Sequence, residues 1–416
     1  MKKFFYLLAA FSAALVGCSK SEVVNAPGAD TPITFKPYTN RALITKGTEA
    51  TITDLGMNGF QVYAFSNEST TPDGVVAGYG DGKTHTPDKK AYMDKQVYNQ
   101  DNAGWTYSGF IYWPATYYLD FVAYGLNDQV EETSPTTLKF TVDSDIATHE
   151  DLLVAAPVID VKHGATGHPT DGGTVPFVFS HLLSRISFLL ETEGNSANAT
   201  DNTLVTLEQV DLVGNFYTEG TVDLTETRTT TLNIGEPDEN GVATAKEAKR
   251  PYITGTTRPE GLVTYKLFGT DGHFSSYGVA VGGDQIFNNS ALYNFDEAEG
   301  NIINQKYVRN SVDEATVNDI NADRYMMVIP VADWSTKTDG TETYANAKLK
   351  VKYFLPGSGS SDVQTVELVS GGNPILFEAG KSYVFKLKVS TWKIGVTGEV
   401  EIWDETNGIT ETFVLG

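Results

Sequence analysis

The feature that most constrains the fold is a set of short segments in which apolar and polar residues alternate. In residues 347–353, Ala, Leu, Val and Tyr fall on one side of an extended chain and three lysines on the other. Because successive side chains of a β-strand point to opposite faces of a sheet, this alternation predicts a strand with one buried and one hydrated face. Few segments keep apolar residues at helical spacing for a dozen positions, and residues 311–324 are polar throughout. The sequence therefore predicts an all-β protein.

Similar segments recur along the chain. They are short, rich in β-branched and aromatic residues, and bounded by Gly, Asn, Asp or Pro, which is typical of strands separated by turns. Many short strands with turn signals between them favour β-sandwiches. We predict further strands at residues 60–65, 118–124, 138–142, 175–179, 204–213, 263–268, 325–329 and 363–369.

The chain of 416 residues is long enough for two domains of ordinary size. Residues 191–202 are small and polar, and they are the best candidate for a boundary. We therefore expect one β-sandwich at residues 33–190 and a second at 191–416. Two loop-rich insertions, residues 235–258 and 271–307, fall in the second half, and loops of that length are usually functional or disordered.

The N-terminus predicts export. Lys2 and Lys3 precede an apolar run, residues 4–14, that is too short to span a bilayer, and small residues follow it. This is the pattern of a secretory signal peptide, which is removed from the mature chain. Cys18, the only cysteine of the sequence, comes directly after Leu-Val-Gly.

The string Leu-Val-Gly-Cys resembles the lipobox of bacterial lipoproteins. The resemblance implies removal of residues 1–17 and acylation of Cys18, and several acyl chains on one residue anchor a protein stably. Ser19 follows the cysteine where an acidic residue would favour the inner membrane, so the same resemblance implies sorting to the outer membrane. A soluble exported protein is the alternative. Residues 18–32 are small and polar with two prolines, and we expect a tether there.

Composition excludes several functions. The formal charge is −23, from 30 basic and 53 acidic residues, and such a surface repels a phosphate backbone, so we expect no nucleic-acid partner. With Cys18 acylated, no thiol remains for disulfides, thiolate catalysis or a cysteine metal site. No later segment has about 18 uninterrupted apolar residues, so we expect no transmembrane helix in the mature chain.

No motif predicts catalysis or metal binding. Residues 77–84 end like a phosphate-binding loop but begin with Ala, and Pro87 follows where a helix should start. Ser180 and His181 are neighbours on a predicted strand, so their side chains point to opposite faces. Paired carboxylates of a glycosidase carry no signal, because 53 acidic residues supply such pairs in any fold.

Two groups of metal-ligating residue types also fall short. His163 and His168 lie in a Gly/Thr/Pro loop without the spacing of a helical zinc pair. The acidic residues Asp143, Asp145, Glu150 and Asp151 lack the glycine and the regular oxygen spacing of an EF-hand. We therefore expect no metal, no cofactor and no enzyme, with a secreted glycosidase or peptidase as a minor alternative.

Six strings of sequence, in a fixed order along the chain, carry a resemblance to a known family. They lie at residues 112–114, 119–124, 151–155, 179–188, 326–330 and 380–387. Together with the lipobox they resemble the fimbrillin family, the subunits of type V pili in Bacteroides-like Gram-negative bacteria. None of the strings is chemically reactive, which suits a structural protein.

The resemblance implies two transthyretin-like β-sandwich domains in tandem after the signal peptide and tether. It also implies export as an outer-membrane lipoprotein and then proteolysis near the N-terminus by a trypsin-like protease. Cleavage removes the first strand and opens a groove, which a C-terminal strand of the neighbouring subunit fills. This is β-strand addition, in which main-chain hydrogen bonds link the subunits.

The chain contains candidates for each part. Residues 33–38 read as a short first strand, and Arg41 and Lys46 beyond it are the candidate cut points. Both are plain surface charges if the subunit is an uncut anchor or tip. Residues 398–403 and 409–415 alternate like two strands with Asn-Gly between them. Either strand is a candidate donor, or both close the second sandwich; the donor residues are Val400, Ile402, Ile409, Thr410, Phe413 and Leu415.

We therefore expect a stalk, tip or anchor subunit of a type V fimbria that mediates adhesion. Its partners would be other fimbrial subunits, the outer membrane through lipid on Cys18, and a ligand on a host or bacterial surface. The precursor would lie at the outer membrane and the product in the extracellular fimbrium. The alternative is a surface lipoprotein that binds glycans through the exposed aromatic residues Tyr79, Tyr92, Trp105 and Tyr107.

Overall fold

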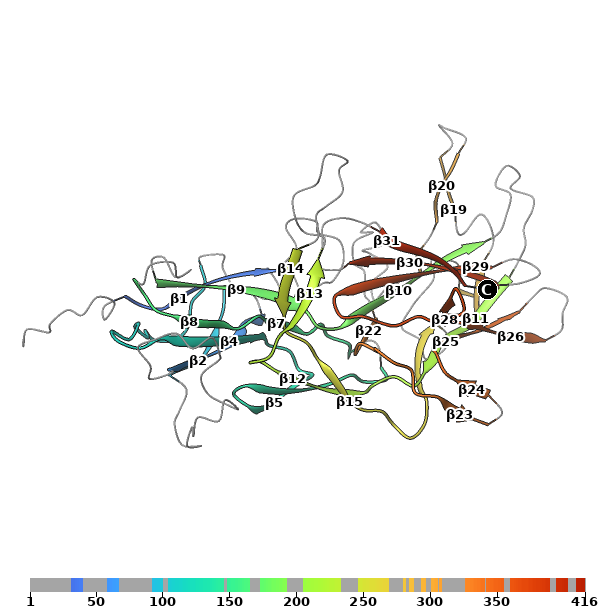
Figure 1. Ribbon diagram of the computed structural model, residues 1–416. Helices are drawn as coiled ribbons and strands as arrows, with labels where there is room; N and C mark the ends of the chain where they lie inside the picture. The colour runs from blue at the N-terminus through green and yellow to red at the C-terminus, as the bar shows by residue number, and fades with distance from the viewer. Residues whose placement is uncertain are drawn as a thin grey trace, which may run out of the picture.

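The computed structural model shows an all-β protein, as the alternating segments predict, and every predicted strand lies on an observed one (Figure 1). It describes residues 31–39, 58–66, 92–99, 104–145, 148–164, 173–192, 205–232, 246–268, 326–340, 342–354, 360–389, 394–402 and 409–415, with short strands between 280 and 308. Within these residues, no helix is long and apolar enough to cross a membrane.

A seven-stranded sheet forms the N-terminal half. Its order is β1-β9-β7-β4-β2-β3, with β8 beside β4. β1 and β9 are parallel, and the other pairs are antiparallel. The strands are β1 (Thr34–Thr39), β2 (Phe60–Ser66), β3 (Met93–Val97), β4 (Leu119–Gly125), β7 (Leu153–Ala155), β8 (Val158–Val161) and β9 (Thr174–His181).

The two faces of this sheet bury different cores. On one face, Phe60 and Phe121 join a cluster confined to the N-terminal half. On the other face, Tyr63 and Tyr124 join a cluster that continues to Phe385 near the C-terminus. Because both faces are covered, β2 and β4 are apolar almost without interruption, as in other strands buried on two sides.

Two six-stranded sheets dominate the C-terminal half. One has the order β21-β10-β29-β30-β31 with β22 beside β10, and the other has the order β17-β18-β11-β25-β26 with β16 beside β11. The first contains β10 (Ser184–Thr192), β21 (Tyr307–Val308), β22 (Met326–Val328), β29 (Lys381–Val389), β30 (Ile394–Ile402) and β31 (Ile409–Leu415). The second contains β11 (Val205–Gly214), β16 (Val263–Phe268), β17 (Ala280–Val281), β18 (Asp284–Phe287), β25 (Lys348–Phe354) and β26 (Ser361–Glu367).

A four-stranded sheet of order β15-β12-β6-β5 joins strands from both halves. Its strands are β5 (Val130–Ser134), β6 (Thr137–Thr141), β12 (Glu219–Asp223) and β15 (Thr254–Thr257). Four two-stranded pairs complete the fold: β13 (Arg228–Leu232) with β14 (Lys246–Arg250), β19 (Tyr293–Asp296) with β20 (Asn301–Gln305), β23 (Lys337–Asp339) with β24 (Glu342–Tyr344), and β27 (Val369–Ser370) with β28 (Asn373–Pro374).

The division of the chain at residues 190 and 191 stays a prediction. β9 and β10 are separated only by Leu182 and Leu183, both buried, and β10 already belongs to the sheet of β29 to β31. β6 of the first half pairs with β12 of the second. The two halves are therefore joined in three ways: β9 leads almost directly into β10, the sheet β15-β12-β6-β5 takes strands from both halves, and one hydrophobic cluster extends through both.

Two expectations about the second half need detail. The segments at 235–258 and 271–307, expected to be loop-rich, contain the short strands β14, β15 and β17 to β20 and the start of β21. The face of β25 expected to be hydrated is partly covered, because Lys348 is only 8% exposed and its ammonium lies 3.1 Å from the Glu367 carboxylate. The alternation itself is confirmed, since Leu349 and Val351 are fully buried. Residues 311–324 lie outside the described part.

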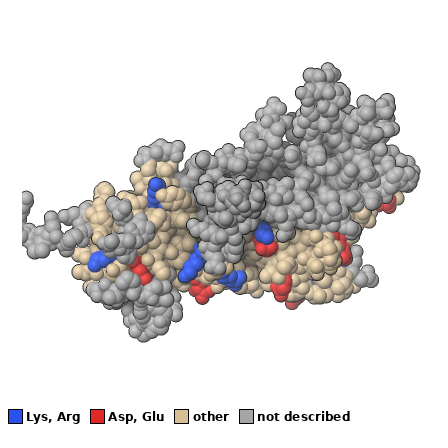
Figure 2. Space-filling model, turned by 45° about the horizontal axis from the view of Figure 1, so that its top comes forward, with Lys and Arg blue, Asp and Glu red and all other residues tan. Residues whose placement is uncertain are grey.

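The surface in Figure 2 carries charges of both signs. On that face, basic and acidic side chains of the described residues lie dispersed among uncharged ones. Pairs such as Lys139 with Glu219, 2.7 Å apart, contribute little to stability because both side chains are partly exposed. The described part of this face therefore has a mixed charge.

Candidate functional site: an edge strand over an aromatic groove

β1 is the end strand of the N-terminal sheet, and it lies beside β9 at one end of the molecule in Figure 1. Its six residues pair in register with six of β9, from Thr34 opposite Thr174 to Thr39 opposite Phe179. Among the described residues, no strand pairs with β1 on its other side. β1 is thus joined to its sheet along one edge only, and its partner β9 lies 140 residues further along the sequence.

The side chains of β1 alternate between the core and the surface. Ile33, just before the strand, is fully buried, and Phe35 and Pro37 are buried too. Thr34, Lys36 and Tyr38 face outward and are exposed. The alternation predicted for residues 33–38 is therefore confirmed.

Phe35 lies in a cage of aromatic rings. Its ring stacks on Phe177 of β9 at 5.7 Å between centroids. It also meets Phe60 edge-on at 6.0 Å, Phe121 at 6.3 Å and Tyr107 at 5.8 Å. Burying Ile33 and Phe35 stabilises the strand by roughly 1.5–3 kcal/mol for each side chain. If β1 left, these rings would line an apolar groove.

An irregular segment, residues 104–113, holds the start of β1 from the open side. The Ile33 amide donates to the carbonyl of Ile111 at 2.8 Å, and the Trp113 amide donates to Thr31 at 3.1 Å. The Tyr107 hydroxyl donates to the Ile33 carbonyl at 2.8 Å. Burial raises the pKa of that hydroxyl above its ordinary value, so it remains a neutral donor. The end of the predicted tether is thus fixed to the folded protein.

Gly173, directly before β9, makes this close approach possible. Its φ of +83° lies in the left-handed region that favours glycine. A Cβ there would lie 2.7 Å from the Thr31 Cγ2 and 3.1 Å from the Trp113 Nε1. The Gly173 carbonyl also accepts a hydrogen bond from the Trp113 indole at 3.1 Å. No sequence pattern marks Tyr107, Trp113 and Gly173 as residues that hold β1, since only the tertiary fold brings them to residues 31–33.

The candidate donor residues lie at the other end of the molecule, in paired strands. β30 pairs with β29, where Val400 lies opposite Tyr383 and Ile402 opposite Lys381. β31 pairs with β30 on its other side, and it is the end strand of its sheet among the described residues. There Ile409, Phe413 and Leu415 lie opposite Glu401, Gly398 and Val396, and Thr410 falls at a register shift. In this chain, both strands lie paired in the C-terminal sheet.

Three predicted sites cannot be placed. Cys18, Arg41 and Lys46 lie outside the described residues, as do the phosphate-loop-like residues 77–84 and His168. Lipidation and proteolytic processing therefore stay predictions.

The described acidic residues and histidines do not form a metal site. The Asp151 side chain is only 3% exposed, and its carboxylate lies 2.5 Å from the His181 Nδ1. The Asp143 carboxylate accepts the amide of Asp145 at 2.9 Å, and this hydrogen bond, with those from Ser144, outweighs burial and holds the pKa of Asp143 below its ordinary value. His163 stacks on Trp113 at 6.2 Å. These contacts are structural.

Two of the aromatic residues considered for glycan binding pack on the core, and a third, Tyr92, is exposed and bonded through its hydroxyl. Trp105 packs on Phe60 at 5.5 Å, and Tyr107 holds β1. The Tyr92 hydroxyl donates to the Tyr112 carbonyl at 2.6 Å. Tyr79 lies outside the described residues. The rings of Trp105 and Tyr107 are therefore engaged by the protein's own core.

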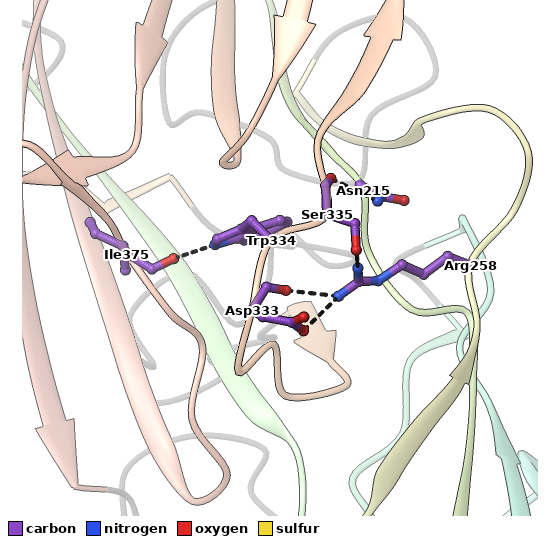
Figure 3. A network of polar contacts seen from close by, with 6 residues as sticks. All are labelled: Asn215, Arg258, Asp333, Trp334, Ser335 and Ile375. Carbon is purple, nitrogen blue, oxygen red and sulfur yellow. Dashed lines mark hydrogen bonds and ion pairs between the residues drawn. The ribbon is translucent and has the colours of Figure 1, made fainter.

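A polar network in the C-terminal half is also structural (Figure 3). The Arg258 guanidinium donates to the Ser335 hydroxyl at 2.5 Å and to the Asp333 carbonyl at 2.8 Å. It lies 3.9 Å from the centre of the Tyr217 ring. The Asn215 amide donates to the Ser335 carbonyl at 3.0 Å. The network fixes the segment after β15 to the segment after β22.

A family comparison identifies the chain. The model of the fimbrillin-like family matches residues 48–264, more than half of the 416 residues. The chain belongs to the fimbrillin-like family. The resemblance to the fimbrillin family is thereby confirmed, and the four strings between residues 112 and 188 lie within the matched range. No curated protein matches it significantly.

One solved structure of low sequence identity shares the fold of this fimbrillin-like protein. A fimbrial protein from Bacteroides vulgatus has 16% sequence identity and a TM-score of 0.51, with 90% of this chain and 100% of that chain covered. A candidate cell adhesion protein from Bacteroides uniformis has 15% identity and a TM-score of 0.42, with 89% and 98% covered. At 16% identity, the likeness to the Bacteroides vulgatus protein shows a shared fold and nothing more.

Proposed function

We propose that this protein is a structural subunit of a type V fimbria, as stalk, tip or anchor, assembled by strand exchange after N-terminal proteolysis. The observation that carries the proposal is β1, an edge strand whose apolar side chains fill an aromatic groove and whose end precedes Arg41 and Lys46. Removal of β1 exposes the edge of β9 and the groove together. An extended strand of a neighbouring subunit then restores both the hydrogen bonds and the buried apolar surface.

The same proposal gives the lipid a temporary role. Acylated Cys18 holds the precursor at the outer membrane, and cleavage at Arg41 or Lys46 separates the anchor and β1 from the rest. A stalk subunit then leaves the membrane for the extracellular fimbrium, whereas an uncut subunit remains as an anchor. Adhesion to other cells or surfaces follows from the assembled fimbria. No catalytic role is proposed for any residue.

Limited proteolysis tests the proposal. The test uses the chain without its signal peptide. We expect trypsin to cut this chain after Arg41 or Lys46 and to leave the Lys36–Pro37 bond intact, because trypsin cleaves poorly before a proline. Intact mass and N-terminal sequencing identify the cut. The cleaved protein should then form an SDS-resistant ladder, and a variant with Arg41→Gln and Lys46→Gln should remain monomeric. A persistent monomer after clean loss of β1 would exclude the stalk role.

Cysteine cross-linking identifies the donor strand. Val178 faces outward on β9 and lies opposite Tyr38 of β1, so a strand that replaces β1 passes beside it. We expect Val178→Cys to form a disulfide between cleaved subunits with either Glu399→Cys of β30 or Thr412→Cys of β31. These two residues lie opposite each other in the C-terminal sheet, which makes them a matched pair. Cross-links with neither cysteine, in a ladder that still forms, would contradict donation by both strands.

A further inference from the structure

Two strand edges matter for strand addition: the outer edge of β1, and the edge of β9 that β1 covers. Each strand contains one proline, but the two prolines face different sides. β1 contains Pro37 and β9 contains Pro176, opposite Lys36 of β1. Proline has no backbone N–H, so it interrupts pairing on whichever side of the strand its nitrogen faces. The hydrogen bonds at the ends of β1 and β9 show which side that is.

In β1, the odd-numbered residues turn their backbone groups away from β9. The Ile33 amide and carbonyl bond to Ile111 and Tyr107, on the side opposite β9. Because backbone groups alternate along a strand, Phe35, Pro37 and Thr39 face the same open side, and Thr34, Lys36 and Tyr38 face β9. Pro37 is thus the middle one of three positions on the open edge, and it offers no N–H there.

In β9, the arrangement is the reverse. The Val178 carbonyl accepts the amide of Ala156 just after β7, so the even-numbered residues of β9 face away from β1. The groups that face β1 belong to Val175, Phe177 and Phe179, and all three have both an N–H and a C=O. Pro176 falls on the other side. The edge of β9 that β1 covers is therefore complete.

We propose that Pro37 is an assembly guard, which keeps a further strand from pairing with the outside of β1. With β1 in place, the sheet ends at an edge interrupted at its central position. Without β1, it ends at the uninterrupted edge of Val175, Phe177 and Phe179. Natural sheets use edge prolines in this way against unwanted pairing. The partner that Pro37 excludes is an extended strand of a second copy of this chain. Only the biological purpose of this exclusion rests on the proposed function.

The guard predicts the behaviour of the uncleaved protein. In the chain behind the leader, without protease, we expect Pro37→Val to form dimers as concentration rises, because it restores the missing N–H and keeps a strand-forming side chain in the core. Wild type should remain monomeric over the same range. The measurement is molar mass by light scattering during size-exclusion chromatography, with circular dichroism to confirm the fold.

Two controls separate edge pairing from other causes. Pro176→Val makes the same change in β9 on the side away from β1, and it should remain monomeric. Adding Thr39→Pro to Pro37→Val moves the missing N–H from position 37 to position 39 of the same edge, and this double variant should again be monomeric. A folded, monomeric Pro37→Val at every concentration, or dimers that persist with Thr39→Pro, would overturn the guard. Failure of cleaved wild type to assemble would instead contradict the proposed function and leave the guard unaffected.

Discussion

Replacing Phe35 with Ala should lower the free energy of unfolding by about 3–5 kcal/mol, the usual cost of deleting a buried aromatic side chain. The ring is 5% exposed and touches Phe60, Phe121, Phe177 and Tyr107, so the surrounding side chains cannot easily close the cavity. Equilibrium unfolding in urea, followed by fluorescence, measures the change.

The same strand supplies a matched control. Tyr38 is 43% exposed, and the Lys36 ammonium lies 5.3 Å from the centre of its ring. Tyr38→Ala should therefore change stability by no more than about 0.5–1 kcal/mol. If both variants lost equal stability, the groove would not be the main support of β1.

Phe35→Ala also has a consequence for assembly. After cleavage, β1 is held only by noncovalent contacts, so weakening it by about 3 kcal/mol should release it on the order of a hundredfold faster. Cleaved Phe35→Ala should then form the ladder sooner than cleaved wild type, and cleaved Tyr38→Ala should not. A slower ladder would contradict the release of β1 as the step that opens the groove for assembly.

The sequence predicts the strands well because burial on one face leaves a period of two. Residues 33–38 and 347–353 show it clearly, and both form strands: burial alternates along 33–38, and in the second strand Leu349 and Val351 are buried while Lys352 is exposed. The expected hydrated face of β25 was wrong at Lys348 because a lysine stem can be covered while its ammonium pairs with Glu367. Periodicity reports which positions alternate, but it does not report which strands become neighbours.

Strand neighbours and irregular supports are therefore what the sequence did not reveal. β1 pairs with β9 across 140 residues, and no local pattern in residues 34–39 specifies that partner or its parallel direction. Residues 104–113 have no strand period, yet they hold the start of β1 through Tyr107 and Ile111. The orientation of Pro37 likewise becomes meaningful only once the partner strand is known.

The six family strings gain a physical meaning in the fold. Residues 151–155 and 179–188 come together where the Asp151 carboxylate meets His181 at 2.5 Å, with both side chains only 3% exposed. The Arg185 guanidinium donates to the Ser382 hydroxyl at 2.9 Å, which joins residues 179–188 to 380–387. These contacts lie where β9, beside the groove, continues into β10 of the sheet that contains the donor candidates. The strings thus mark the connection between the two ends of the subunit.

Asp151→Ala should accordingly be among the most destabilising single changes, at about 3–5 kcal/mol, because it breaks a polar pair in which both side chains are only 3% exposed. Asp151→Asn keeps an oxygen that can accept from the imidazole, so we expect it to retain part of the stability. Asp128→Ala, an exposed acidic residue of the same half, is the control and should change stability by less than about 0.5 kcal/mol.

The position of the pair predicts a second effect. Because Leu182 donates its amide to Leu152 next to it, loosening Asp151 and His181 also loosens the joint between β9 and β10. Hydrogen exchange in Asp151→Ala should therefore speed up at the ends of β7 and β9 more than at β3, on the far edge of the sheet. Uniform acceleration would mean that the pair supports the whole fold. Acceleration confined to the joint would mean that it couples the groove to the C-terminal sheet.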